Sequence, residues 1–545
     1  MKRHLLKFFD RIEETDITPV SFVTAFTAIV VFRIAIEQTL VSFRNHSPES
    51  YFLTFTHYFL EFLFTLLLTL PIVRWANGGD FRKAANLVLF SFLLVLTPPI
   101  TDLIIMGNPA PFSIYEFGSF QETVRHFFTF FDNTPETGIT YGIRLEIALS
   151  VLGIALYAYL RSRKLRKAII SGILVYAILY LVSTFPSWVT FVLLAPDKGL
   201  LNITAFDTVG LFLSPEQILS SPAPSMVNAL HAKMILVYGV LLVPTVGAIL
   251  FRYFRRYFLA LWRNVRLPQI VWHGGLLALG GILAMTFAGA QPNFDIFGIL
   301  AVLALVAAVE SAWIASVIAN DFADRRIDEV TNPERPLPAH TIPEHLYREM
   351  SILFFLASLL LAATVGIKLA VILFAYQAIA WIYSMPPLRL KRFPGVATIL
   401  SSSAGILVLL AGFLAISTAG VLSTVPTSLL VFLFVAYILT IPLKDFKDVR
   451  GDGGDGVFTL PVLLGIPRAR LVIGSLLFAC YAASPVVFHE VRFIVPGVLF
   501  GSLAYWSIAK ADHGRKPLVT FRTLAAWNML IAFLYGLTAA AIVLR

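Results

Sequence analysis

Long apolar runs recur along the whole 545-residue chain, and they limit its possible folds more than any other feature. Two examples are 294–318 and 525–544, which reach the roughly 20 residues that a membrane-spanning helix needs. Hydrophobic residues make up 58% of the chain and charged residues only 14%, against about 25% in a typical soluble domain. The sequence therefore predicts an all-α polytopic membrane protein and excludes a soluble enzyme. No basic soluble module is present for binding nucleic acid.

Windows of about 19 residues predict about six spans followed by about nine more. They lie near 16–40, 51–73, 84–106, 139–160, 168–195, 227–251, 268–290, 294–318, 346–366, 367–385, 396–417, 424–443, 470–488, 492–509 and 522–544. A basic joint at 252–266 separates the two sets. It predicts an N-terminal multi-span membrane domain of unknown role over 1–265 and a second domain over 266–545.

The positive charges indicate the orientation of the spans. The chain carries 42 Lys and Arg residues against 32 Asp and Glu residues, a net charge of +10. Most of the Lys and Arg residues fall in alternate connections, and such connections face the cytoplasm. We therefore expect an integral protein of the cell membrane with a cytoplasmic N-terminus.

Two acidic segments interrupt the apolar pattern, both on the predicted cytoplasmic side. Asp321, Asp324 and Asp328 precede Asp445, Asp448 and Asp452 by the same 124 positions. The spacing i, i+3 and i+7 predicts three carboxylates on one helix face in each segment. The constant offset indicates an internal duplication of a four-helix unit.

Carboxylates stacked on one helix face repel one another, and the cost rises at a membrane boundary. A hard divalent cation removes this conflict, because Mg²⁺ prefers carboxylate oxygens and substrate phosphates as ligands. Lys and Arg residues are interleaved with both segments and could bind the phosphates. The two segments therefore predict a metal–diphosphate site at the mouth of a helical bundle, rather than two merely solvated acidic loops.

Three motifs in this order resemble the UbiA superfamily of intramembrane prenyltransferases. The first is Asn320-Asp-x-x-Asp-x-x-x-Asp328, followed by Asn332-Pro-Glu-Arg-Pro-Leu337. The second is Tyr383-Ser-Met-Pro-Pro-Leu-Arg-Leu-Lys-Arg392, and the third begins with Lys444-Asp-x-x-Asp-x-x-x-Asp452. The resemblance covers roughly 268–545 and implies a nine-helix bundle there, with the further six or so spans placed before it.

The resemblance implies a reaction and a role for each matching residue. An isoprenyl diphosphate, held by two Mg²⁺ ions, loses diphosphate, and a lipophilic acceptor captures the allylic cation. The implied metal ligands are Asn320, Asp324, Asp328, Asp445, Asp448 and Asp452. The implied diphosphate-binding residues are Arg335, Lys444, Lys447, Arg389 and Lys391. The implied catalytic residues are Asp321, Asp324, Asp445, Asp448 and Tyr383.

The acceptor stays open at the level of a class. The motifs are compatible with a quinone precursor, a chlorophyllide-like ring or a glycerol-phosphate lipid as the hydrophobic or aromatic acceptor. A UbiA-type terpene cyclase is an alternative, because it would ionise the same donor. A transporter or a non-catalytic membrane scaffold is the alternative from another class, although the acids lie at span ends rather than at the midplane.

The N-terminal half contains ionisable residues within its predicted spans, which often mark function in membrane proteins. They are Arg33, Glu37, Glu61, Asp102, Arg144, Glu146 and Lys233. The simpler interpretation is structural: Arg33 and Glu37, and less regularly Arg144 and Glu146, pair with each other or with neighbouring helices. A second hypothesis is that residues 1–265 bind a membrane partner protein or shape the entry route of the acceptor.

Overall fold

A computed structural model of the chain describes residues 2–40, 48–106, 115–132, 139–220, 224–417, 422–447, 449–454, 458–512, 519–521 and 523–543. These residues form helices and contain no β-strand, only two isolated β-bridges. The prediction of an all-α protein is confirmed. The described chain divides into two compact units. Unit 1 comprises 1–216 and 223–249, and unit 2 comprises 217–222 and 250–545.

Unit 1 contains six helical segments that are long and apolar enough to cross a membrane, among the residues described. Its elements are α1 (Lys2–Glu13), α2 (Pro19–Leu40), α3 (Pro48–Ala76), α4 (Phe81–Ser91), η1 (Phe92–Leu96), α5 (Thr97–Met106), α6 (Phe120–Thr129), α7 (Tyr141–Ser162), α8 (Leu165–Ser183), α9 (Phe185–Lys198), η2 (Leu200–Asn202), α10 (Ala205–Leu213) and most of α11 (Met226–Tyr253). The single span predicted near 168–195 is divided after α8. Pro186 lies in the first turn of α9, a position that proline favours at the start of a new helix.

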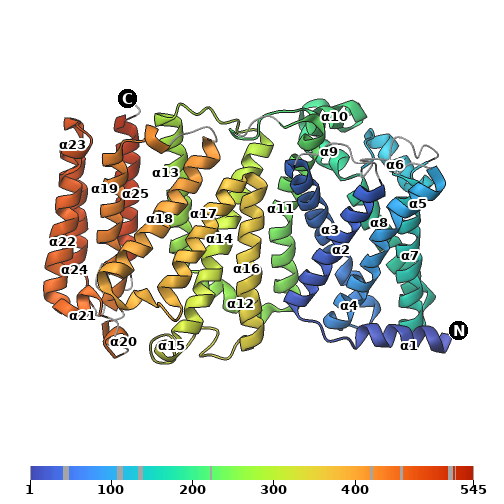
Figure 1. Cartoon of the computed structure of the whole chain (residues 1–545), viewed down its shortest axis with the longest axis horizontal. Helices are drawn as coiled ribbons and strands as arrows, with labels where there is room; N and C mark the ends of the chain where they lie inside the picture. Colours follow the sequence, from blue (N-terminus) through green and yellow to red (C-terminus); the bar gives the residue numbers. More distant parts are fainter. Residues whose placement is uncertain are drawn as a thin grey trace. The chain divides into compact units, whose positions relative to one another are not determined.

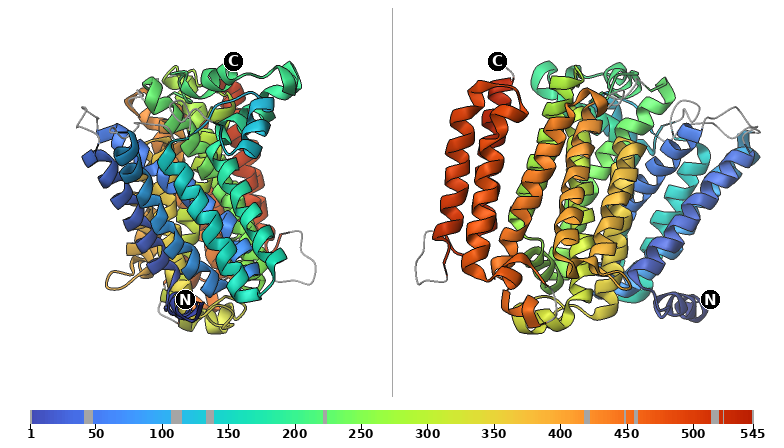
Figure 2. Two further views of the ribbon diagram at one scale, coloured as in Figure 1. Left: turned by 90° about the vertical axis from the view of Figure 1, so that its right-hand side faces the viewer. Right: turned by 60° about the vertical axis from the view of Figure 1, so that its left-hand side comes forward.

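Unit 2 is a bundle of nine long helices within the described residues (Figure 1). Its elements are α12 (Arg255–Asn264), α13 (Leu267–Phe287), α14 (Ile296–Ala323), α15 (Arg325–Thr331), α16 (Glu344–Val365), α17 (Ile367–Ser384), η3 (Leu390–Arg392), α18 (Pro394–Ile416), η4 (Leu422–Thr424), α19 (Thr427–Thr440), η5 (Ile441–Lys447), α20 (Val449–Gly454), α21 (Leu460–Leu464), α22 (Ile466–Ala482), α23 (Ser484–Val487), η6 (Val491–Phe493), α24 (Ile494–Lys510) and α25 (Leu524–Val543). The right-hand view of Figure 2 shows the last long helices of unit 2, coloured orange to red, side by side. Helix α24 packs against both α22 and α25. The predicted nine-helix bundle is confirmed. Seven of these helices, all but α22 and α25, are long and apolar enough within the described residues to cross a membrane.

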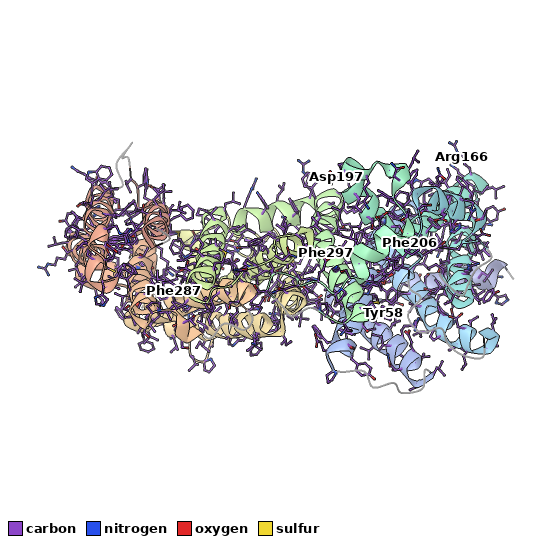
Figure 3. The ribbon with its side chains drawn as sticks, turned by 90° about the horizontal axis from the view of Figure 1, so that it is seen from above. Tyr58, Arg166, Asp197, Phe206, Phe287 and Phe297 are labelled. Carbon is purple, nitrogen blue, oxygen red and sulfur yellow. The ribbon has the colours of Figure 1, made fainter. Side chains whose placement is uncertain are left out.

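Helix α14 carries the first acidic segment to one end of unit 2. The helix begins at the N-cap Asp295, whose carboxylate accepts a hydrogen bond of 2.8 Å from the amide of Gly298. Ala304, Ala308 and Ala312 follow at four-residue spacing and are fully buried. Such small side chains let membrane helices approach closely. The labels in Figure 3 mark the opposite end of the bundle, where Phe287 ends α13 and Phe297 lies in the first turn of α14.

Helices α13 and α18 are in direct backbone contact through two glycines. A β-carbon at Gly280 would lie 1.9 Å from the carbonyl oxygen of Leu409, and one at Gly412 would lie 2.1 Å from the carbonyl oxygen of Leu277. No side chain can be added at either position unless the helices separate.

Replacing Gly412 by valine should therefore destabilise the protein by about 1 to 3 kcal/mol or more, because overpacking forces the backbones apart. The measurement is the thermal unfolding midpoint of the detergent-purified chain. Gly274→Val is the matched control on α13, since a β-carbon there meets nothing within 4 Å. An unchanged midpoint for Gly412→Val would contradict the close contact.

Candidate active site

A cavity of about 460 Å³ opens at the end of unit 2 where α14 and α17 end and α18 begins. The short helices α15, α20 and α21 lie at this same end, at the bottom of Figure 1. Nine of the residues predicted for the site line the cavity. They are Asn320, Asp324, Asp328, Arg335, Tyr383, Lys391, Lys444, Asp445 and Lys447.

Asn320 and Asp324 form the centre of a charged cluster at the cavity wall. The amide of Asn320 donates to Asp324 over 2.9 Å, and its Oδ1 accepts from Lys391 at 3.0 Å and from the Ser384 hydroxyl at 2.9 Å. Lys391 also forms an ion pair with Asp324, and Arg389 donates to the same carboxylate at 3.1 Å. Two predicted diphosphate-binding residues and two predicted metal ligands therefore meet in one network.

The buried Lys391 is stabilised as a cation by this network. Burial lowers the pKa of its ammonium group, and the neighbouring Asp324 carboxylate opposes that shift. Lys391 is only 8% exposed as a side chain. Lys391 lines the cavity as a largely dehydrated group that an anionic ligand would share with Asp324.

Asp321 lies apart from the cavity and belongs to a buried network. Its Oδ2 accepts hydrogen bonds of 2.7 Å from both Tyr347 and Asn264, and its Oδ1 accepts from Arg335 at 3.2 Å. The residue is 1% exposed. These contacts fix α14 to α12 and α16, and the catalytic role of Asp321 stays a prediction.

Asp328 shares Arg335 with Asp321. Arg335 donates to Oδ2 of Asp328 at 2.5 Å, and Asn332 donates to Oδ1 at 3.0 Å. Burial raises the pKa of Asp328, while Arg335 opposes this shift. The three aspartates do not share one continuous helix face, so that prediction is wrong. Helix α14 ends at Ala323 and α15 begins at Arg325. Arg335 bridges the carboxylates of Asp321 and Asp328 across this break and so offsets their repulsion.

The second acidic segment lies on η5 and α20. Lys444 donates to the hydroxyl of Tyr383 over 3.4 Å, and its ammonium group lies 5.6 Å from the centre of that ring. Asp445 and Lys447 line the same cavity. Asp448 lies outside the described residues, and so does the side chain of Asp452. The η5 segment is a 3₁₀ helix, so here too the segment is not one regular α-helix.

The deeper cavity wall contains polar residues that the sequence reasoning missed. Gln269 and His273 line it from α13, and His273 Nδ1 lies 3.3 Å from the carboxylate of Glu310 on α14. Tyr437 lines it from α19 and accepts a hydrogen bond of 2.9 Å from Trp272. His273 and Glu310 could have been found, because both are ionisable residues inside apolar spans.

Within the described part of the chain, no three or more His, Cys, Asp or Glu side chains gather into a metal-binding group. The oxygen atoms of Asn320, Asp324 and Asp328 at the cavity nevertheless form the donor set that a hard cation prefers. In this structure Lys and Arg side chains occupy those oxygens.

Comparison with known proteins gives a consistent result. The model of the UbiA prenyltransferase family matches residues 277–542. The bacteriochlorophyll synthase 34 kDa chain of Chloroflexus aurantiacus is 30% identical over 234 residues, which cover 42% of this chain and 73% of that protein. The digeranylgeranylglyceryl phosphate synthase of Ignicoccus hospitalis is 30% identical over 243 residues, which cover 41% of this chain and 78% of that protein.

Among solved structures, a UbiA homologue from Archaeoglobus fulgidus bound to DMAPP and Mg²⁺ aligns with a TM-score of 0.38 and 19% identity. The alignment covers 51% of this chain and 99% of that one. The family match and the two 30%-identical relatives confirm the resemblance seen in the three sequence motifs. The chain therefore belongs to the UbiA prenyltransferase family and is an intramembrane prenyltransferase.

Proposed function

We propose that the cavity of unit 2 binds a prenyl diphosphate together with Mg²⁺ and transfers the isoprenyl group to a hydrophobic or aromatic acceptor. One observation carries the proposal: a single cavity joins a cluster of Lys and Asp side chains at its mouth to a wall of apolar and aromatic residues. The charged end suits a diphosphate, and the apolar wall suits a prenyl chain. An apolar wall also keeps water away from an allylic cation.

The cationic side chains act on the leaving group. Lys391 and Arg389 lie beside Asp324, and Lys444 and Lys447 line the opposite segment of the mouth. Fixed positive charges in a partly dry site stabilise the charge that grows on departing diphosphate. Tyr383 presents its ring beside Lys444, where its π-face could stabilise the allylic cation.

The residues at the mouth fit Mg²⁺, because they offer carboxylate and amide oxygens as ligands, which the cation would take over from their present Lys and Arg partners. Asn320, Asp324 and Asp328 would hold one ion, and Asp445, Asp448 and Asp452 would hold the second. Bound Mg²⁺ supplies charge neutralisation to the diphosphate. Asp321 is placed to support Arg335 and thereby to orient Asp328.

The names of the relatives support an acceptor class. The names of two of them refer to the synthesis of bacteriochlorophyll and of digeranylgeranylglyceryl phosphate. We accordingly propose a chlorophyllide-like ring or a glycerol-phosphate lipid as acceptor, with a quinone precursor as the further member of the predicted class. We also propose that the site faces the cytoplasm, which the distribution of Lys and Arg supports.

The test uses the purified full chain with geranylgeranyl diphosphate, MgCl₂ and a total lipid extract, with products identified by mass spectrometry. We expect a product heavier than its acceptor by one prenyl group, and EDTA should abolish it. Diphosphate release without acceptor, yielding a hydrocarbon or alcohol, would favour the terpene cyclase. No release from folded protein with several donor lengths would contradict prenyl transfer by this site.

The same assay in sealed vesicles tests the sidedness. The diphosphate does not cross membranes, so only vesicles with the cytoplasmic face outward should turn it over. Activity confined to the opposite orientation would contradict the proposed topology.

Binding of a partner protein by residues 1–265 stays a prediction. Crosslinking in native membranes should give a heavier species containing this chain, and its absence would argue against a partner.

A further inference from the structure

Unit 1 contains a cavity of its own, of about 160 Å³, between α2, α3, α7, α8 and the α4–α5 segment. None of its lining residues belongs to unit 2. Five lining residues are ionisable, and they lie within apolar spans. They are Arg33, Glu37, Glu61, Asp102 and Glu146. Ionisable groups in membrane spans are costly and usually mark a function.

Two of the four carboxylates have structural partners. Glu37 pairs with Arg33 at 2.7 Å, one turn apart on α2. Oδ1 of Asp102 accepts a hydrogen bond of 2.7 Å from the amide of Gly142 in the first turn of α7. This bond satisfies a donor that the start of a helix leaves open.

Other polar atoms at the cavity have no partner among the described residues. Oε2 of Glu61 and Nε of Arg33 are buried and accept or donate no hydrogen bond. Glu61 is 4% exposed and Arg33 is 9% exposed. Glu146 lies close enough to act electrostatically on Glu61. Buried polar atoms are nearly always hydrogen-bonded in native proteins, so these two atoms need a partner that the described side chains do not supply.

The neighbouring histidine cannot supply the missing contact. His57 Nε2 lies 3.9 Å from Oε2 of Glu61, beyond hydrogen-bonding distance. Both ring nitrogens of His57 already have partners: Nδ1 meets Nδ1 of His231 at 2.7 Å, and Nε2 meets the hydroxyl of Tyr115 at 2.6 Å. Tyr115 in turn donates to Tyr238 at 3.1 Å. Glu61 itself forms a side-chain hydrogen bond with Tyr115. Its Oε2 forms none, and Glu61 lines the cavity.

The ionisable residues gather at one end of the cavity, and the other end is apolar. On α3 the lining residues run from Tyr58, labelled in Figure 3, to Val73. Glu61 and Val73 are about 18 Å apart along the helix at 1.5 Å per residue. That end is lined mainly by apolar residues, namely Leu66, Val73, Val88, Phe92, Ile154 and Val175, together with the smaller polar residues Thr69, Ser91 and Ser150. The cavity is therefore amphipathic along its length.

We propose that this cavity binds an uncharged amphiphile with a hydroxyl head group and a single hydrocarbon chain. A hydroxyl group donates one hydrogen bond and accepts others, so it can donate to Glu61 and accept from Arg33. A cationic head group would leave Nε of Arg33 without an acceptor. An anionic one would face Glu61 and Glu146. The chain of the ligand lies along the apolar end. Prenyl alcohols and alkylglycerols share this chemistry.

The test is photolabelling of the full-length chain in detergent with two diazirine-bearing probes, a C20 prenyl alcohol and a 1-O-alkylglycerol. We expect saturable labelling that maps to α3 or α7. Excess of the unlabelled alcohol should displace it, whereas the C20 hydrocarbon without a hydroxyl group should not. The probe that labels at the lower concentration identifies the source of the hydroxyl head group.

Three variants separate the head-group contacts from the chain. Glu61→Leu and Arg33→Leu should each weaken binding about tenfold or more, because each loses a charge-assisted hydrogen bond. Thr69→Phe narrows the apolar end and should exclude C20 chains while admitting shorter ones. Glu49→Gln is the matched control, since Glu49 lies exposed at the beginning of the same helix.

The unfolding midpoint and the gel-filtration profile show whether each variant is folded. If Glu61→Leu or Arg33→Leu fails to fold, Thr69→Phe still tests whether the hydrocarbon chain lies in this cavity. Labelling that is displaced equally by the hydrocarbon would overturn the proposal. So would labelling unchanged in Glu61→Leu. The readout is binding in unit 1, so it is independent of prenyl transfer in unit 2.

Discussion

Asp324→Ala is expected to lower the rate of prenyl transfer by about a thousandfold or more while leaving the protein folded. Asp324 is where the acidic and basic halves of the mouth meet, because it contacts Asn320, Lys391 and Arg389. Its removal takes away a proposed metal ligand and frees two cations from their fixed positions. The side chain is 15% exposed, so its loss leaves no large buried cavity.

The measurement is the steady-state rate with geranylgeranyl diphosphate, Mg²⁺ and the identified acceptor. Asp324→Asn separates charge from shape, and a loss of similar size would assign the effect to the charge. Glu329→Gln is the matched control, because Glu329 lies exposed on the adjacent α15. A near-normal rate for Asp324→Ala would contradict the assignment of this residue to the metal site.

Arg335→Met is expected to have the largest effect on stability. Arg335 forms ion pairs with both Asp321 and Asp328, and these aspartates are 1% and 2% exposed. Removing one partner of a buried ion pair leaves an uncompensated charge and typically costs about 3 to 5 kcal/mol. The unfolding midpoint of the purified protein should fall steeply as a result.

Arg326→Met is the control for this substitution, since Arg326 lies exposed on α15. The unfolding midpoint of each variant is measured first. The KM for the prenyl diphosphate is then measured with the folded fraction of the purified protein. An unchanged midpoint with a raised KM would show that Arg335 binds substrate, as the sequence motif implies, rather than holding the two aspartates. Asp321→Asn should lower the midpoint less, because the amide oxygen of the new side chain can still accept hydrogen bonds from Tyr347 and Asn264.

The sequence predicts the helices of this protein well because each span must satisfy its own backbone in the membrane. The proximity of Asn320, Asp324, Lys391 and Lys444 could also be predicted from the sequence, because motifs at span ends on one side of the membrane meet at one end of the bundle. The sequence could not predict that Asp321 faces inward. Its partners Tyr347 and Asn264 lie on other helices, and residue spacing does not reveal them. The break between α14 and α15 at Asp324 likewise depends on contacts with other helices, which residue spacing does not reveal.

The N-terminal half shows a different limit. Intramembrane residues such as Arg33 and Glu61 can be found from the sequence, and pairing was the simpler interpretation. The structure confirms this for Arg33 and Glu37. For Arg144 the described partners are the backbone oxygens of Phe131, Asp132 and Ile139 instead of Glu146. Charge counts cannot distinguish these cases, because the outcome depends on which helix faces meet.

The cluster around Asp324 has a thermodynamic consequence. Lys391 and Arg389 already neutralise this carboxylate. A cation binding alone must compete with Lys391 for Asn320 and Asp324, and an anion binding alone must draw the same lysine away from them. When both ligands bind, the carboxylate exchanges an ammonium partner for a metal and the ammonium exchanges a carboxylate for a phosphate. Affinities for the two are therefore linked, by an amount on the order of 1 to 3 kcal/mol, and each must raise the other by the same factor. The concentration of free Mg²⁺ thus sets the apparent affinity for the prenyl donor.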